Sequence, residues 1–432
     1  MLTLVLLLMI LVGFALMSRG KLSQEVALPI IALGALVLAG APDNLTALQG
    51  GFAEFSRILL IFTAVAVPAH LLQRGNVLRW VGLLLGEWIG IAVRSSRLPA
   101  WLLVPCVTLL LTWAMAAAFH NTTSILVCAQ IIVVICRSYS LPVLPTLSGA
   151  LVASNLGGFS TRWGDTPNII EAGVWRLQHV DFFREIMPIN LGLLLLVSIV
   201  AALWTRFKLA HMRASTDFET ALATVDFERA RQQLVIDVRL FAVGLLGISM
   251  AVLAPMIFPA RELAIAALVK LICVMLDRHD RRRESITALG LETYATLAGV
   301  FVLAHVLTHT SIGVGGYVQH WLEGSGMSVW AIASAAYFGT LFTEAASWAS
   351  AAAPIVYASA PSHTAAWALG GGICAGSSSL VTAATAGILL SKETKRLNQE
   401  ERVTFGSYVL FGLATSAAML AYYVAVLTLL SR

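Results

Sequence analysis

Apolar runs of roughly the length that crosses a bilayer recur from one end of this sequence to the other. Examples are Leu2 to Met17, Met187 to Trp204 and Phe241 to Phe258. A helix of about 20 residues spans the hydrocarbon core and satisfies every backbone amide within itself, which lipid cannot do. The sequence therefore predicts an all-α polytopic membrane protein.

Composition and charge narrow the function class. The 432 residues are 58% hydrophobic and only 12% charged, a balance that would leave a water-soluble domain with large exposed apolar patches. The net charge of +5 lies mostly in short loops, where it orients spans in the bilayer. Lipid, and not nucleic acid, is the expected partner.

Cofactor and enzyme signatures are missing from the sequence. No glycine-rich nucleotide loop of the Walker type occurs, so the expected energy source is an ion gradient. The five cysteines have no C-x-x-C spacing, which argues against a disulfide framework and against a zinc site. We therefore expect a secondary transporter without cofactors or resident metal, and no enzyme.

Two halves of the chain resemble each other. Residues 206–238 form a polar, charged interruption that predicts a cytoplasmic linker between a first membrane repeat, 1–205, and a second, 239–432. The segment IFTAVAVPAHLLQRG from Ile61 resembles AGVFVLAHVLTHTS from Ala298. Two later pairs of segments follow in the same order, which is typical of an internal repeat.

The distribution of Lys and Arg predicts the topology. Placing the basic loops on the cytoplasmic side gives about ten transmembrane helices plus two re-entrant hairpins, 101–136 and 329–358, that enter from opposite faces. Broken helices are expected at 143–175 and 364–391. The two repeats are thus predicted to be inverted, with both termini outside a bacterial cytoplasmic (inner) membrane or a membrane derived from it.

Each predicted hairpin turns at a polar cluster. The first tip has His120, Asn121, Thr122, Thr123 and Ser124, and the second has Thr343, Glu344 and Ser347. Polar backbone at membrane depth is tolerated where it lines a cavity or is buried in protein. Ion or substrate binding at the tips is the functional interpretation, and ordinary loops outside the membrane are the alternative.

The first broken helix holds an acidic residue in a spanning segment. Glycines and a proline between Asn155 and Asn168 interrupt the helix and predict an unwound stretch around Asp165. An ionisable side chain at this depth is by default a site hypothesis. A carboxylate that is neutral at rest and ionised beside a cation can exchange H⁺ for that cation, and Glu344 is the second candidate.

Two neighbouring groups admit two interpretations each. Arg162, three residues before Asp165, is either a counter-ion that keeps the carboxylate ionised or an anchor for an anionic substrate. His120 either shuttles protons or caps a hairpin helix as a neutral group.

These residues also carry a family resemblance. Asn155, Gly157 and Gly158, followed by Thr161, Gly164 and Asp165, are similar to the motif N-x-G-G-x-x-[ST]-x-x-G-D, and Asn121 to Ser124 resemble a D-N-x-T-T hairpin tip. Both motifs belong to the ion transporter superfamily, which includes NhaD-type sodium/proton antiporters, ArsB-type arsenite permeases, the melanosomal P protein, and citrate and dicarboxylate carriers. Asp165 favours the antiporter, arsenite and P protein branches.

The resemblance implies a site shared by both repeats, with departures. His120 and Glu344-Ala345 replace family Asp and Asp-Asn, and serines replace much of the expected Gly and Asn in the second broken helix. The expected ion- or substrate-binding residues are Asp165, Asn121, Thr122, Thr123, Asn155, Thr161, Asn168, Glu344, Ser378 and Ser379, with Asp165, Glu344 and His120 coupling protons. One dominant ion site is expected in the first half.

Three functions remain open. The leading hypothesis is exchange of Na⁺ or another small cation for H⁺ by alternating access. The alternative is a cation-coupled or uniporting permease for arsenite or a small carboxylate. A non-transporting membrane assembly subunit is the third, and the superfamily resemblance implies a homodimer.

Overall fold

The computed structural model describes residues 2–430 apart from residues 20, 23, 97, 163, 212–230, 259–260, 278–290, 314, 343–344 and 398–401. The described residues form helices joined by short turns, and none of them lies in a β-strand. In the first half the helices are α1 (Leu2–Ser18), α2 (Gln24–Ala39), α3 (Asp43–Arg74), α4 (Val77–Ser96), α5 (Ala100–Phe119), α6 (Asn121–Ser138), α7 (Val143–Phe159), α8 (Thr166–Trp175), α9 (His179–Asp181), the π-helix η1 (Phe182–Ile186) and α10 (Met187–His211). In the second half they are α12 (Val238–Ile257), α13 (Glu262–Leu276), α15 (Leu291–His309), α16 (Gly315–Gly324), α17 (Val329–Phe342), α18 (Ala345–Ser359), α19 (His363–Ser377), α20 (Thr385–Arg396) and α21 (Phe405–Leu430).

The lengths and hydropathy of these helices confirm an all-α polytopic membrane protein. Three of the described segments, Ala100–Ala118, His179–Ala210 and Phe405–Leu430, are long and apolar enough to cross a membrane by themselves. Shorter apolar helices of 10–17 residues accompany them. The number of crossings stays a prediction, because several of these helices are interrupted or end inside the protein.

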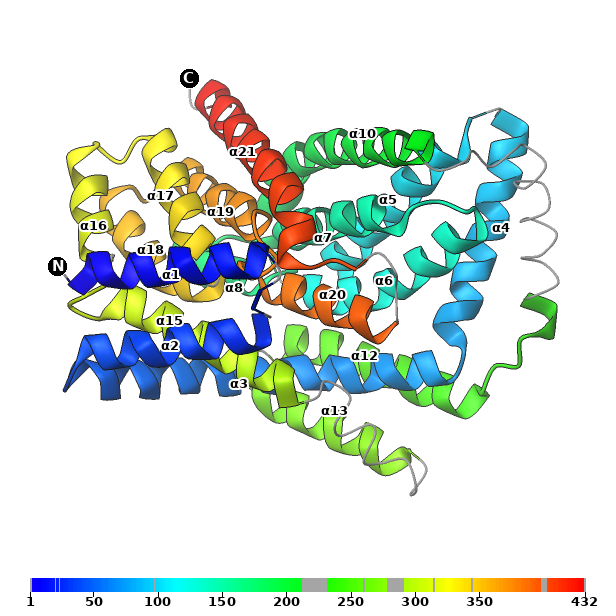
Figure 1. Cartoon of the computed structure of the whole chain (residues 1–432), viewed down its shortest axis with the longest axis horizontal. Coiled ribbons are helices and arrows are strands. Elements are labelled where there is room, and N and C mark those ends of the chain that lie inside the picture. The colour runs from blue at the N-terminus through cyan, green and yellow to red at the C-terminus, as the bar shows by residue number, and fades with distance from the viewer. Residues whose placement is uncertain are drawn as a thin grey trace.

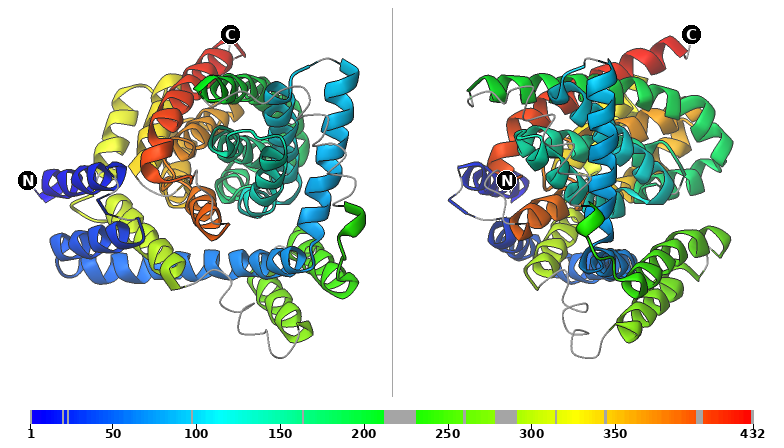
Figure 2. Two further views of the ribbon diagram at one scale, coloured as in Figure 1. Left: turned by 45° about the vertical axis from the view of Figure 1, so that its right-hand side comes forward. Right: turned by 90° about the vertical axis from the view of Figure 1, so that its right-hand side faces the viewer.

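The helices pack in two groups (Figures 1 and 2). The scaffold helices are α1, α2, α3, α12, α13 and α15. They have two apolar clusters of their own, around Leu303 and Leu71, and a further cluster packs Met17 and Leu28 against Ile388 of the central bundle. The central bundle is α5–α8, α10 and α17–α21, and its largest cluster joins residues of both halves, such as Leu156 of α7 and Ile373 of α19. The central bundle therefore holds the interface between the halves.

Both halves repeat one order of elements within the central bundle. A helical pair, α5 and α6 or α17 and α18, precedes two helices, α7 and α8 or α19 and α20, that are separated by a short irregular segment. α4 and α16 each lie across the long axis of the molecule, at opposite ends (Figure 1). An inverted repeat would produce this arrangement, and the inverted relation itself stays a prediction.

The helix α10 continues to His211, beyond residue 205, where the sequence places the end of the first membrane repeat. That repeat boundary stays a prediction. Trp204 of α10 stacks on Phe411 of α21 at a ring-centroid distance of 5.1 Å. Residues 212–230, most of the predicted linker, lie outside the described residues.

Candidate functional site

The interruption between α7 and α8 is shorter than the sequence predicts. Asn155, Gly157 and Gly158 are regular residues of α7, and only the stretch from Ser160 to Asp165 leaves the helix. Gly157 serves a different purpose, because a Cβ there would collide with the backbone oxygen of Trp113 in α5. That glycine permits close helix packing and does not unwind the chain.

Asp165 occupies the N-cap of α8. Its backbone is extended and its Oδ1 accepts a hydrogen bond from the Thr166 N–H at 2.8 Å. The side chain is partly buried. The N-terminus of α8 directs a positive partial charge at this point, while the carbonyls of Leu156, Gly157 and Gly158 at the end of α7 already accept hydrogen bonds. The dipole of α8 therefore favours the ionised form of Asp165.

Asn168 and Thr161 hold the interruption together. The Asn168 amide donates to the backbone oxygens of Gly158 at 2.8 Å and of Thr161 at 2.7 Å. The Thr161 hydroxyl donates to the backbone oxygen of Ala117, at the end of α5, at 2.8 Å. Both predicted ligands thus use their donors to shape the loop, and their oxygens remain acceptors.

The first hairpin tip is docked against this loop. The Asn121 N–H donates to the Gly164 oxygen at 2.9 Å. His120 joins α5 and α6 with a φ of 124°, a conformation that favours glycine, and its ring accepts from the Thr122 N–H at 3.4 Å. Its Nδ1 also lies 2.9 Å from the Thr122 hydroxyl. Of the two interpretations of His120, this geometry matches the helix cap.

A directed chain of hydrogen bonds crosses from the first half to the second. Ser378 Oγ donates to the Cys374 oxygen at 2.9 Å, so it accepts from Asn155 Nδ2 at 3.1 Å. Asn155 Oδ1 then accepts from Asn121 Nδ2 at 3.5 Å. This order of donors and acceptors fixes which side-chain atom of Asn121 and of Asn155 is the oxygen and which is the nitrogen. It leaves Asn121 Oδ1 buried with no hydrogen-bond partner among the described residues.

Two of the sequence-predicted ligands of the first half, Asn121 and Asn155, belong to this chain, together with Ser378 of the second half. The Asn121 side chain lies in hydrogen-bonding reach of the Asp165 carboxylate. Asn155 and Ser378 are fully buried beside it, whereas the Ser379 hydroxyl bonds back to Gly376 in its own turn. Glu344 and Thr343 lie outside the described residues, as do the side chains of Thr123 and Ser347.

Arg162 contacts neither predicted partner within the described part of the chain. The ion pairs found there do not include one between Arg162 and Asp165. The side chain is partly exposed, and its charge acts on His179 at the start of α9. The geometry thus provides no contact for the counter-ion interpretation.

Sequence reasoning missed Glu171. This residue lies in α8, six positions after Asp165, with no exposed surface. Neither carboxylate oxygen has a hydrogen-bond partner among the described residues. A signal was present, because Glu171 is an ionisable residue inside the apolar second part of a predicted spanning segment, the criterion that singled out Asp165.

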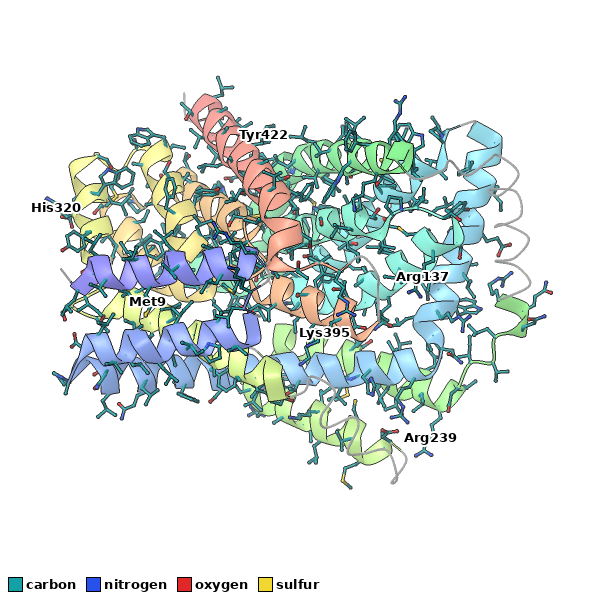
Figure 3. The ribbon with its side chains drawn as sticks, viewed as in Figure 1. Met9, Arg137, Arg239, His320, Lys395 and Tyr422 are labelled. Carbon is teal, nitrogen blue, oxygen red and sulfur yellow. The ribbon has the colours of Figure 1, made fainter. Side chains whose placement is uncertain are left out.

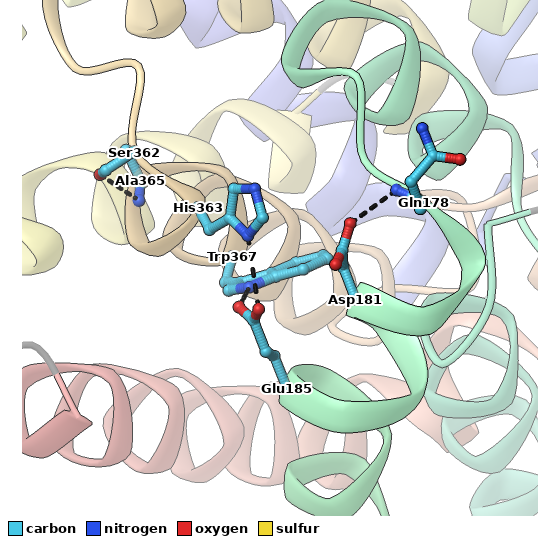
Figure 4. Close-up of polar contacts among 7 residues, drawn as sticks. All are labelled: Gln178, Asp181, Glu185, Ser362, His363, Ala365 and Trp367. Atoms are coloured by element: carbon cyan, nitrogen blue, oxygen red, sulfur yellow. Dashed lines mark hydrogen bonds and ion pairs between the residues drawn. The ribbon is translucent and has the colours of Figure 1, made fainter.

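A peripheral cluster of potential ligand side chains joins η1 to α19 (Figure 4). The ligand atoms of Asp181, Glu185 and His363 lie within 4.8 Å of one another. Glu185 accepts from the Trp367 indole at 2.6 Å and approaches His363 Nδ1 at 3.4 Å, and Asp181 accepts from the Gln178 N–H at 2.7 Å. These bonds make the cluster an exposed polar contact between two elements.

Relatives of the chain include magnetosome proteins and uncharacterized transporters. The magnetosome protein MamN of Magnetospirillum gryphiswaldense is 29% identical over 347 residues, 78% of this chain and 75% of its own length. MamN of Paramagnetospirillum magneticum is 28% identical over 351 residues, with the same shares. An uncharacterized transporter of Mycobacterium tuberculosis is 23% identical over 255 residues, 59% of this chain and 56% of its own length.

A family model gives the assignment. The model described as "Citrate transporter", CitMHS, matches residues 1–387. This model represents the citrate carriers of the ion transporter superfamily. The sequence motif around Asp165, in contrast, favoured the antiporter, arsenite and P protein branches of the same superfamily. With apolar helices throughout and a hairpin docked on an interrupted helix, the chain belongs to the citrate transporter family of the ion transporter superfamily and is an integral membrane secondary transporter.

Proposed function

We propose that the protein exchanges a small cation, such as Na⁺, for H⁺ at Asp165. The observation that carries this proposal is the unpartnered, buried Oδ1 of Asn121, whose side chain lies within hydrogen-bonding reach of the Asp165 carboxylate. A buried amide oxygen without a donor is costly, and a cation bound between it and the carboxylate would relieve that cost. Carboxylate and carbonyl oxygens are the ligands that hard cations prefer.

Competition between the two ions would provide the coupling. A carboxylate that holds a proton has lost the negative charge that binds the cation, so H⁺ and cation occupy Asp165 alternately. Thr122, Asn155, Thr161 and Ser378 are the proposed neutral ligands. Glu344 is retained as a second titrating ligand from its sequence position alone.

Alternating access in this proposal is a movement between the two packing groups. The hairpin tip bonds to the α7–α8 loop through Asn121 and Gly164, so tip and loop would move together. The scaffold helices, with two apolar clusters of their own, would stay in place. Such rocking of one group against another around a fixed site is the usual mechanism of inverted-repeat transporters.

The test is proton flux in proteoliposomes that contain a pH-sensitive dye. Pulses of Na⁺, Li⁺ or K⁺ should release protons from wild type, and Asp165→Asn should abolish the signal because the amide cannot titrate. Asp43→Asn is the matched control, since Asp43 caps the distant start of α3 and bonds to Ser311. Normal flux in Asp165→Asn, or a silent wild type, would refute the proposal.

The second candidate is transport of a small carboxylate or arsenite with a coupled cation. The match to a citrate transporter family favours it. Citrate or arsenite should then raise the melting temperature only when a cation is present. Stabilisation by cations alone favours exchange, while stabilisation by anion and cation together favours the carrier.

A third class comes from the relatives named as magnetosome proteins. A membrane subunit that only assists assembly would move no tracer ion or anion when purified and reconstituted alone. Flux of any cation or anion through the purified protein excludes this class.

A further inference from the structure

Glu171 is a fully buried carboxyl group that the exchange proposal does not use. It has no exposed surface, and no described residue offers either oxygen a hydrogen bond. Its helix, α8, packs against α18 and α19 of the second half. The group therefore lies at the interface between the halves.

The site of Glu171 is formed by a glycine of the opposite half. A Cβ on Gly370 of α19 would lie 2.6 Å from Glu171 Oε2 and would also collide with the Phe159 ring of α7. Any larger residue at position 370 would fill the volume that the carboxyl group occupies. α7, α8 and α19 thus enclose a space that just accommodates a glutamate side chain.

The titratable neighbours of Glu171 are few. Asp165, at the start of its own helix, acts on it electrostatically. From α19 the Cys374 thiol interacts with both carboxylates, and Tyr423 of α21 interacts with Cys374 and donates to Asn190 at 2.6 Å. The described residues of α7, α18 and α19 include no Lys or Arg, and His363 at the exposed start of α19 faces Glu185.

This environment stabilises only one form of the group. An ionised carboxylate without cation, donor or water access carries a large desolvation penalty. The protonated acid lacks only a hydrogen bond, which is a far smaller cost. Glu171 in this conformation therefore carries a proton.

We propose that Glu171 is a second proton-binding site of the transport cycle, and that it gives up its proton in the state of the cycle in which water reaches the contact between α8 and α19. The proposal rests on the proposed exchange at Asp165. Glu171 lies six residues after Asp165, which corresponds to about 9 Å of rise along a helix axis at 1.5 Å per residue, and we treat the two carboxyl groups as separate proton sites. The two carboxyl groups thus load separately, and each cycle moves one proton on Glu171 in addition to the proton at Asp165.

The charge balance makes this testable. One monovalent cation exchanged for two protons moves net charge, so an imposed membrane potential should alter the cation-driven proton flux of the wild type. In Glu171→Gln one proton exchanges for one cation, so the response to the potential should be lost. Glu323→Gln, the same change at an exposed residue of α16, is the matched control.

A spectroscopic readout tests the proton directly. The infrared C=O band of an unbonded carboxylic acid should be present in the full-length protein and absent from Glu171→Gln. It should persist in Asp165→Asn and Glu323→Gln. If Glu171→Gln does not fold, Glu171→Met, which fills a similar volume without polar atoms, takes its place.

The outcomes separate the two proposals. Loss of the band together with loss of the potential response, or of all flux, supports the second proton site. A band unchanged in Glu171→Gln, or wild-type flux with a wild-type potential response, overturns it. A wild type that moves no protons for any cation refutes the exchange proposal, while the infrared band still decides whether Glu171 holds a proton.

Discussion

Single residues of this transporter are constrained more by close packing than by backbone freedom. Gly157 lies in a regular part of α7, where its missing side chain lets α5 approach. Gly372 of α19 has the equivalent contact with the backbone oxygen of Ala333 in α17. Each hairpin is thus held against its interrupted helix by a glycine, and the site geometry depends on that distance.

We expect Gly157→Ala to destabilise the protein by about 1–3 kcal/mol, because the new methyl group must displace backbone and not a flexible side chain. Gly173→Ala is the control. Gly173 is an exposed residue of α8 with no atom near its missing Cβ, so alanine should be neutral or stabilising by up to about 1 kcal/mol. Unfolding in detergent measures both, and equal effects would contradict the packing explanation.

At the scale of elements, ion pairs join helices that are distant in sequence. Arg74, at the end of α3, binds Asp277 after α13 at 2.7 Å, and the Asp277 side chain has no exposed surface. Arg231 binds Glu87 of α4 at 3.1 Å, with side chains 29% and 21% exposed. The two pairs have similar chemistry and different burial, which makes them a direct comparison.

Asp277→Asn should cost about 3 kcal/mol or more, because it removes the negative charge that pairs with the nearly buried Arg74. Glu87→Gln should cost about 0–1 kcal/mol, because water solvates the charges that remain. Thermal unfolding of the two variants in the same detergent provides the comparison. A larger loss for Glu87→Gln would show that burial does not set the strength of these pairs.

At the scale of the whole molecule, different exposed side chains lie toward the two ends of the long axis. α16 with His320 lies at one end, and Arg137, at the end of α6, lies on the other side of the centre (Figure 3). Both side chains are exposed. The predicted inverted topology places these two positions on opposite membrane faces.

Single cysteines at Arg137 and His320, in a background without the five native cysteines, should therefore react with a membrane-impermeant maleimide from opposite sides. Labelling of intact cells and of inverted vesicles provides the measurement. The positive-inside rule predicts that the cysteine at position 137 is cytoplasmic. Reaction of both positions from the same side would refute the predicted topology.

The sequence by itself determined that this protein lies in a lipid bilayer, and it determined the order of the helices. Both follow from local properties, because hydropathy and helix-breaking residues act on nearby residues. The all-α membrane fold and the superfamily are confirmed by the structure and the family match, and residues 160–165 interrupt a helix inside the predicted broken segment. Tertiary structure decided which polar atoms lack partners. Asn121 Oδ1 and the Glu171 carboxyl group become buried and unpartnered only when α7, α8 and α19 pack together. Burial of this kind depends on neighbours that are more than 200 residues away in the chain. The hydrogen bond between Asn155 and Ser378 is an example.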